Sequence, residues 1–154
     1  MDLTINLEDY KLNIRAGAII IHNNKVLTHK NKNEKHYALI GGRVELGEDS
    51  ETTIKRELKE ELGKDVQITG YITTVENFFE DNGKKFHEIL FVHRAEFTNE
   101  DDKKINYPLK NMEGNDNLQY EWIDINKIDS YPLLPITIKE MLKSHNYKSH
   151  IINK

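Results

Sequence analysis

The sequence of 154 residues has no cysteine, three prolines and one tryptophan. Without cysteine, disulfide frameworks, thiolate zinc sites and thiol nucleophiles are all excluded. Arginine is scarce and the sequence pI is near 6.0, which argues against broad binding to the phosphate backbone of DNA or RNA. We therefore expect no nucleic-acid polymer as a partner.

Long apolar runs are missing as well. The longest, from Ala16 to Ile21, is far shorter than the roughly 20 residues that a membrane-spanning helix requires. Residues 1–10 include three acids and lack the apolar core of a signal peptide. The sequence therefore predicts no membrane partner and a cytoplasmic location.

The length and the 37% apolar content predict one domain over residues 1–154, with a frayed tail from about residue 145. The formal net charge of -4 is unevenly distributed. Seven acids and three bases lie between Glu45 and Glu61, so this segment alone has the surplus of the whole chain. The negative charge is therefore a local feature.

Hydrophobic patterning predicts strands at residues 14–21 and 26–29, joined by a two-residue turn within His22–Lys25. A short strand at 36–40 is expected to end at Gly41-Gly42, and a helix to run from an N-cap at Asp49 or Ser50 to Leu62. A long strand pair follows at 66–80 and 85–97, then a polar loop at 98–117 and a strand at 118–123. The C-terminal segment predicts a brief helix at 124–128, followed by a more strongly indicated helix with Pro135 in its first turn.

The predicted helix ending at Leu62 has two distinct faces. A helix advances by about 100° per residue, so Ile54, Leu58 and Leu62 form an apolar stripe. The carboxylates of Glu57, Glu60 and Glu61 share one arc beside it. Such an arc is either a solvated acidic face or a site for a hard divalent cation, because Mg²⁺ prefers oxygen ligands.

The segment from Gly42 to Lys64 resembles the signature box of the Nudix hydrolase family, G-x5-E-x7-R-E-U-x-E-E-x-G-U, where U is a bulky aliphatic residue. The last position departs from the pattern, since Lys64 replaces the aliphatic residue, and Val66 is expected to pack in its place. Many relatives also have proline where this chain has Ile40. The matching residues are Gly42, Glu48, Arg56, Glu57, Leu58, Glu60, Glu61 and Gly63.

The resemblance implies an α/β fold of the α+β type, an α/β/α sandwich around a mixed β-sheet. It also implies a pyrophosphohydrolase that cleaves a diphosphate linkage with Mg²⁺ or Mn²⁺. By the same resemblance Glu57, Glu61, Glu60 and the carbonyl of Gly41 would bind the metal. Glu57, Glu60, Arg56 and Glu48 would be the catalytic group. Within it Glu60 is a further ligand or the base, Arg56 orients Glu57, and Glu48 ties the loop to the helix.

Outside the box the pattern leaves more alternatives open. Glu113 and Asp116 lie where some relatives have a further acid, and Lys30 lies where relatives often have a phosphate-binding cation. Plain solvation in the loop is the simpler explanation for the two acids, and an ordinary surface lysine explains Lys30 equally well. Aromatic residues that could stack on a base, although strand aromatics are more often core, are Tyr37, Phe78 and Phe79.

The proline and the tyrosine that mark two other Nudix subgroups are absent, so the resemblance does not favour the substrates of those subgroups. By elimination we expect a MutT-like activity, in which a nucleoside triphosphate is cleaved to a monophosphate and pyrophosphate. The alternatives are an ADP-ribose or nucleotide-sugar pyrophosphatase and a non-catalytic nucleotide-binding domain. Retention of every box acid favours catalysis. The expected partner is a nucleotide-type small molecule, and the chain is expected to be a monomer or homodimer.

Overall fold

The computed structural model describes residues 1–104 and 109–154. Within these residues nine strands form one mixed sheet whose main order is β3-β4-β5-β2-β7-β6-β9, with β1 paired to β2 and β8 to β4. The β2-β7 and β6-β9 pairs are parallel and the others are antiparallel. The strands are β1 Thr4–Asn6, β2 Tyr10–Ile19, β3 Ile21–His22, β4 Lys25–Asn31, β5 Ala38–Arg43, β6 Val66–Asp81, β7 Lys84–Phe97, β8 Leu118–Asp124 and β9 His150–Asn153.

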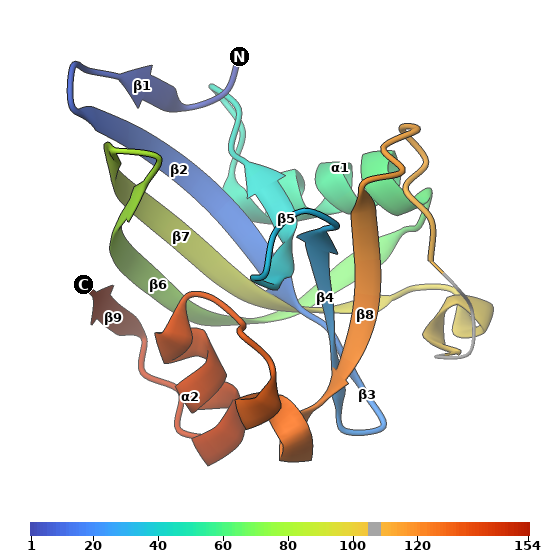
Figure 1. The fold of residues 1–154 in the computed structure, drawn as a ribbon. Helices are drawn as coiled ribbons and strands as arrows, with labels where there is room; N and C mark the ends of the chain where they lie inside the picture. The colour runs from blue at the N-terminus through green and yellow to red at the C-terminus, as the bar shows by residue number, and fades with distance from the viewer. Residues whose placement is uncertain (105–108) are drawn as a thin grey trace.

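Helices cover both faces of this sheet. Helix α1 (Ser50–Leu62) lies behind it in Figure 1, and α2 (Ile136–Ser144) lies in front with the 3₁₀ helix η2 (Ile125–Ser130). One core joins the sheet to α2 and η2 through residues such as Leu90 and Ile138. The other joins it to α1 through Ala16, Ile54 and Leu58. This is the expected α/β/α sandwich.

The first hairpin forms at the predicted turn. Asn23 and Asn24 both have left-handed backbone angles, φ 49° and 59°, which are typical of a two-residue type I′ turn. Strand β2 begins earlier than predicted, at Tyr10, because residues 10–13 pair with β7 and residues 11–13 also pair with the unpredicted strand β1. Strand β5 likewise continues through Gly41-Gly42, which pair with Ala16 and Gly17 of β2.

Two further expectations need correction. The predicted helix at 124–128 is the 3₁₀ helix η2, and the polar loop at 98–117 contains a second one, η1 (Glu100–Lys103). The part of that loop at residues 105–108 lies outside the described residues.

The prediction of a frayed tail from about residue 145 is wrong. Residues 150–153 form β9, which pairs in parallel with Thr74–Asn77 of β6. Tyr147 and Ile151 pack against the α2 core, so the segment is held by apolar contacts as well as by backbone hydrogen bonds. Helix α2 itself begins one residue later than predicted, because Pro135 is its N-cap.

Candidate active site

Helix α1 has well-defined ends. The Asp49 carboxylate accepts a hydrogen bond from the backbone N–H of Thr52 at 2.8 Å, and Gly63 adopts the left-handed conformation with φ 66°. Ile54 and Leu58 are fully buried against the sheet. Burial of this apolar stripe fixes the rotation of α1, so the neighbouring acidic arc faces the end of β5.

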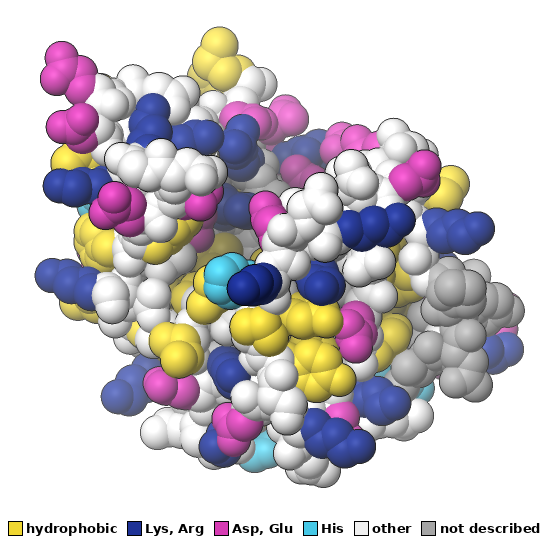
Figure 2. Space-filling view, viewed as in Figure 1, with side chains coloured by type: hydrophobic (Ala, Val, Ile, Leu, Met, Phe, Trp, Pro, Cys, Tyr) yellow, Lys and Arg dark blue, Asp and Glu magenta, His cyan; other side chains and the backbone are white. Residues whose placement is uncertain are grey.

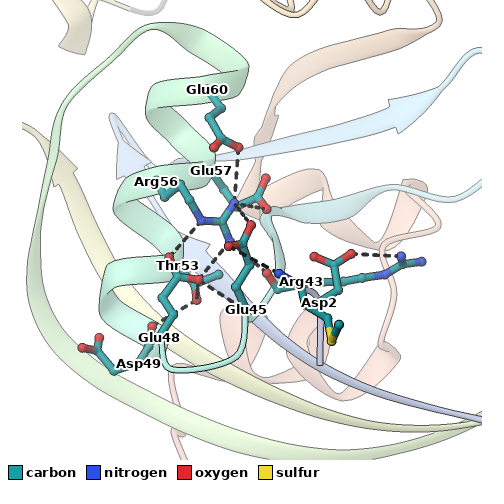
Figure 3. Close-up of polar contacts among 10 residues, drawn as sticks. Asp2, Arg43, Glu45, Glu48, Asp49, Thr53, Arg56, Glu57 and Glu60 are labelled. Atoms are coloured by element: carbon teal, nitrogen blue, oxygen red, sulfur yellow. Dashed lines mark hydrogen bonds and ion pairs between the residues drawn. The ribbon is translucent and has the colours of Figure 1, made fainter. Parts of the chain in front are cut away.

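Arg56 is the centre of the acidic segment (Figure 3). It donates from Nε to Glu48 Oε1 at 2.8 Å and from Nη2 to Glu48 Oε2 at 2.9 Å. Nη1 donates to Glu57 Oε1 at 2.9 Å and to Glu60 Oε2 at 3.3 Å. Nη2 also donates to the carbonyl of Arg43 at the end of β5, 3.1 Å away. One guanidinium therefore holds three acids of the helix segment and ties them to the sheet.

Glu48 is stabilised as a carboxylate. Besides the two bonds from Arg56, its Oε2 accepts from Thr53 Oγ1 at 2.8 Å and from the backbone N–H of Glu45 at 3.2 Å. These bonds, the Arg56 contact above all, lower the pKa of Glu48 to about 2. These contacts fix the loop before α1 to the helix.

The two glycines that end β5 allow close approach. A Cβ on Gly42 would lie 2.3 Å from Cδ of Glu57, so the carboxylate occupies the space that any larger residue would fill. A Cβ on Gly41 would lie 1.9 Å from the carbonyl oxygen of Ala16. Glu57 is therefore seated directly on the backbone of β5.

Glu61 is the acid least satisfied by the protein. Its side chain is buried, with 8% exposure, and Oε2 has no hydrogen-bond partner among the described residues. Burial, followed by the nearby charges of Glu57 and Glu113, raises its pKa to about 8. The pKa of Glu57 is also raised, mainly by burial, although Arg56 opposes the shift. Like charges thus gather around an unpaired buried oxygen, an arrangement that a cation stabilises.

The loop before β8 meets the end of α1. The backbone N–H of Met112 donates to the carbonyl of Glu61 at 2.7 Å, and the Asn111 side chain caps the turn by accepting from the N–H of Glu113 at 2.9 Å. Glu113 is exposed, yet its charge acts on both Glu57 and Glu61. No such effect is recorded for Asp116 among the described residues. Of the two loop acids, the structure therefore brings Glu113 to the cluster.

The sequence analysis missed Arg15. This half-buried side chain on β2 makes no hydrogen bond or ion pair with the described residues, but its charge lowers the pKa of Glu61 and of His29. Arg15 is paired in register with Arg43 of β5, whose own side chain pairs with Asp2 at 3.3 Å, so Arg15 is the cation that acts on Glu61. A cation inside an otherwise apolar strand was the available signal.

The four weaker candidates lie in three separate places. Lys30 Nζ lies over the ring of Tyr37, 5.3 Å from its centroid, and Tyr37 packs edge-on against Tyr131. Phe79 stacks on Phe86 with centroids 4.7 Å apart, whereas Phe78 contacts His87 on the opposite face of β6. Phe78 and Phe79 are therefore not brought together at one site.

The donor set suits a hard divalent cation. Among the described residues no three Asp, Glu or His side chains are already arranged to hold a metal ion. Arg56 instead engages Glu48, Glu57 and Glu60. The unpaired Glu61 oxygen and the crowded negative charge nevertheless fit Mg²⁺ or Mn²⁺, which prefer oxygen ligands.

Comparison with known proteins identifies the family. The NUDIX domain model matches residues 11–144, so the chain belongs to the Nudix family. Members of this family are pyrophosphohydrolases that generally depend on a divalent metal and act on nucleotide-type substrates. The chain is accordingly a Nudix-type pyrophosphohydrolase.

Solved structures show the same fold. The mutator MutT protein of Bacillus halodurans has a TM-score of 0.64 at 19% identity, with 90% of this chain and 86% of that chain covered. The E. coli ORF135 protein has a TM-score of 0.56 at 22% identity, over 87% and 88%. An ADP-ribose pyrophosphatase from Streptococcus suis has a TM-score of 0.59 at 13% identity, over 90% and 98%. None of the curated proteins matches this chain in sequence.

No helix within residues 1–104 and 109–154 is long and apolar enough to cross a membrane.

Proposed function

We propose that the protein hydrolyses a nucleoside triphosphate to a monophosphate and pyrophosphate. The observation that carries the proposal is the complete set of box acids, assembled around Arg56 with a buried Glu61 oxygen unpaired among the described residues. A non-catalytic nucleotide-binding domain would not need this costly concentration of like charge.

Glu57 and Glu61, with Glu60 and the carbonyl of Gly41, would hold Mg²⁺ or Mn²⁺. The bound ion would neutralise charge on the diphosphate oxygens and lower the pKa of a coordinated water. Crowding of Glu57, Glu60, Glu61 and Glu113 supports this assignment, because each of the other three acids raises the pKa of Glu61.

The chain's own residues supply orientation and proton transfer. Arg56 and the backbone of Gly42 fix the position of Glu57, and Glu48 fixes Arg56. Glu60 accepts from Arg56 through Oε2, which leaves Oε1 to accept a proton from the attacking water. The water oxygen bonds to phosphorus while the bridging P–O bond breaks, and pyrophosphate departs with the electron pair.

A second candidate is hydrolysis of ADP-ribose or a nucleotide sugar. The fold is about as similar to the ADP-ribose pyrophosphatase from Streptococcus suis (TM-score 0.59) and to a UDP-X diphosphatase (TM-score 0.59) as to the MutT proteins. The same acids serve both reactions, since each breaks a diphosphate linkage.

A substrate panel tests the proposal. Nucleoside triphosphates, ADP-ribose, nucleotide sugars and dinucleoside polyphosphates are incubated with and without Mg²⁺, and products are resolved by chromatography. We expect Mg²⁺-dependent pyrophosphate release from a triphosphate, and loss of it in Glu57→Gln. Glu51→Gln, an exposed acid in the first turn of the same helix, is the matched control. Metal-independent turnover, or full activity of Glu57→Gln, contradicts the proposal.

A further inference from the structure

A row of polar side chains crosses five strands on the face of the sheet opposite α1. The register places Thr4 opposite Asn13, Asn13 opposite Glu88, and Glu88 opposite Asn77. Asn77 is in turn opposite Asn153 of β9. Side chains directly opposite each other lie on one face, so these residues form a continuous row from β1 to β9.

The middle of this row is almost inaccessible. Asn13, Asn77 and Glu88 are exposed by 4%, 6% and 6%. Asn153 Nδ2 donates to Asn77 Oδ1 at 2.8 Å, Asn77 Nδ2 donates to Glu88 Oε1 at 3.3 Å, and Thr4 Oγ1 donates to Asn13 Oδ1 at 3.0 Å. Buried polar groups of this kind are normally fully hydrogen-bonded.

Two atoms of this row make no hydrogen bond with the described residues, namely Oε2 of Glu88 and Nδ2 of Asn13, whose side chains occupy facing positions on β7 and β2. Neither belongs to the fully buried unpaired atoms of the described residues, so both keep some contact with solvent. A carboxylate oxygen that can accept a hydrogen bond thus lies beside an amide N–H that can donate one, and neither bonds to the protein. Such a pair can bind a ligand, whereas a purely structural network would use both atoms.

The surroundings connect the row to the acidic cluster. Arg15 is two residues beyond Asn13 on the same face of β2, a distance of about 7 Å along a strand. On the other side of the row, Phe79 and Phe86 stack on the same face, with Lys11 Nζ 5.6 Å from the Phe86 centroid. The row therefore lies between a cation close to Glu61 and an aromatic pair.

This part of the face is open. Figure 1 shows α2 in front of one end of β6 and β7 and α1 behind the sheet, so that neither helix covers β2, β6 and β7 near β1. In the same view, Figure 2 shows the surface hollowed in this region, with basic and acidic side chains around the hollow. A substrate whose diphosphate lies at Arg15 and Glu61 would reach the row with its non-phosphate part.

We propose that Glu88 and Asn13, supported by Asn77, form the specificity site for the nucleoside part of the substrate. The ligand chemistry that fits is a pair of adjacent hydrogen-bond donors, which one carboxylate accepts, next to an acceptor for the Asn13 amide. Two parts of a nucleotide offer it: the N1–H and amino group of a guanine edge, and the hydroxyls of a ribose. This inference rests on the proposed function, because a phosphate group held at the metal site, in substrate or monophosphate product, is what places the nucleoside over the row.

Binding of monophosphate products tests the site independently of turnover. GMP, IMP and 2′-deoxy-GMP are titrated by calorimetry in the presence of Mg²⁺ into the wild type, Glu88→Gln and Glu80→Gln. IMP lacks the amino group, and 2′-deoxy-GMP lacks one hydroxyl. Glu80 is an exposed neighbour on β6 and is the matched control.

We expect the wild type and Glu80→Gln to favour GMP over one of the two analogues by roughly tenfold. A preference over IMP assigns the base, and a preference over 2′-deoxy-GMP assigns the ribose. In Glu88→Gln the same ratio falls to about one, because the amide offers a single acceptor oxygen. Asn13→Ala, with thermal melting as a check on folding, gives a second measurement if Glu88→Gln is unstable.

Two outcomes overturn the inference. One is a wild type that binds all three nucleotides equally or not at all. The other is a folded Glu88→Gln that keeps the wild-type ratio, which would make the row a purely structural network. Absence of hydrolysis with selective binding intact contradicts the proposed function instead, so the two failures are distinguishable.

Discussion

Arg56 and Glu48 form a two-pronged ion pair, with 2.8 Å between Nε and Oε1 and 2.9 Å between Nη2 and Oε2. The remaining guanidinium nitrogen donates to Glu57. Lysine is a point charge and cannot reproduce this fork. The positions of the Glu48 and Glu57 carboxylates therefore depend on the guanidinium of an arginine, and a positive charge alone would not fix them.

Arg56→Lys is expected to lower the free energy of unfolding by about 2 kcal/mol, because partly buried acceptors of Glu48 and Glu57 lose their donors. The turnover number falls as well, since Glu57 is no longer held. Urea denaturation and steady-state kinetics measure the two effects. Lys55→Arg, on the exposed side of the same turn, is the control; equal behaviour of the two variants would contradict the role assigned to Arg56.

The pKa of Glu48 predicts acid sensitivity. Its folded-state value of about 2 is below the ordinary value of 4.5, so the carboxylate stabilises the fold above pH 4.5 and this contribution is lost as the pH falls towards 2. The full contribution is about 3 kcal/mol. Stability measured between pH 7 and 3 should therefore decline less steeply in Glu48→Gln than in the wild type. Parallel curves would show that Glu48 is not the titrating group.

Glu61 predicts the opposite trend in metal-free protein. Its pKa is raised to about 8, so its contribution is present below pH 4.5 and is lost as the pH rises through 8. In EDTA, Glu61→Gln should keep more of its stability than the wild type between pH 5 and 8. The same variant should lose the rise in Tm that Mg²⁺ gives the wild type. Scanning calorimetry with and without Mg²⁺ measures both, and an undiminished Mg²⁺ effect in Glu61→Gln would remove this residue from the metal site.

Gly42→Ala tests the contact between β5 and Glu57. The added methyl group would lie 2.3 Å from Cδ of Glu57 and must displace the carboxylate, so kcat is expected to fall by at least tenfold, as is typical when a catalytic group is misplaced. Gly70→Ala is the control, because a Cβ there meets nothing within 4 Å. Activity assays on both variants give the comparison, and equal activity would mean that Glu57 has room to move.

The two loop acids are expected to behave differently. Glu113 adds negative charge at Glu57 and Glu61, so Glu113→Gln should weaken the apparent affinity for Mg²⁺ in activity titrations. Asp116→Asn should leave it unchanged. The reverse ranking would transfer the role to Asp116.

Much of the acidic segment follows from its sequence. The helix from Ser50 to Leu62, its caps and its buried stripe all form where predicted, because a capping carboxylate, a glycine and a 3.6-residue pattern agree there. Val66 also takes the packing role that Lys64 cannot fill, and is buried beside Leu62. Local signals sufficed for these elements.

The rest depends on contacts between distant residues. β9 contains only four residues and is stabilised by pairing with β6, more than 70 residues earlier, so no local pattern indicates it. The same holds for Arg15, whose relation to Glu61 arises from the pairing of β2 with β5. The spacing of residues along the chain does not predict which distant residues the pairing of strands brings together.

Five oxygens from four residues share the guanidinium of Arg56. In a diverging lineage, loss of any one partner leaves the others with weakened or unbalanced bonds. Glu48, Arg56 and Glu57 are therefore expected to be kept together or replaced together. Homologues descended from this chain that retain only one or two of the three should be rare. When such chains give up catalysis, the acids and the arginine should disappear as a unit.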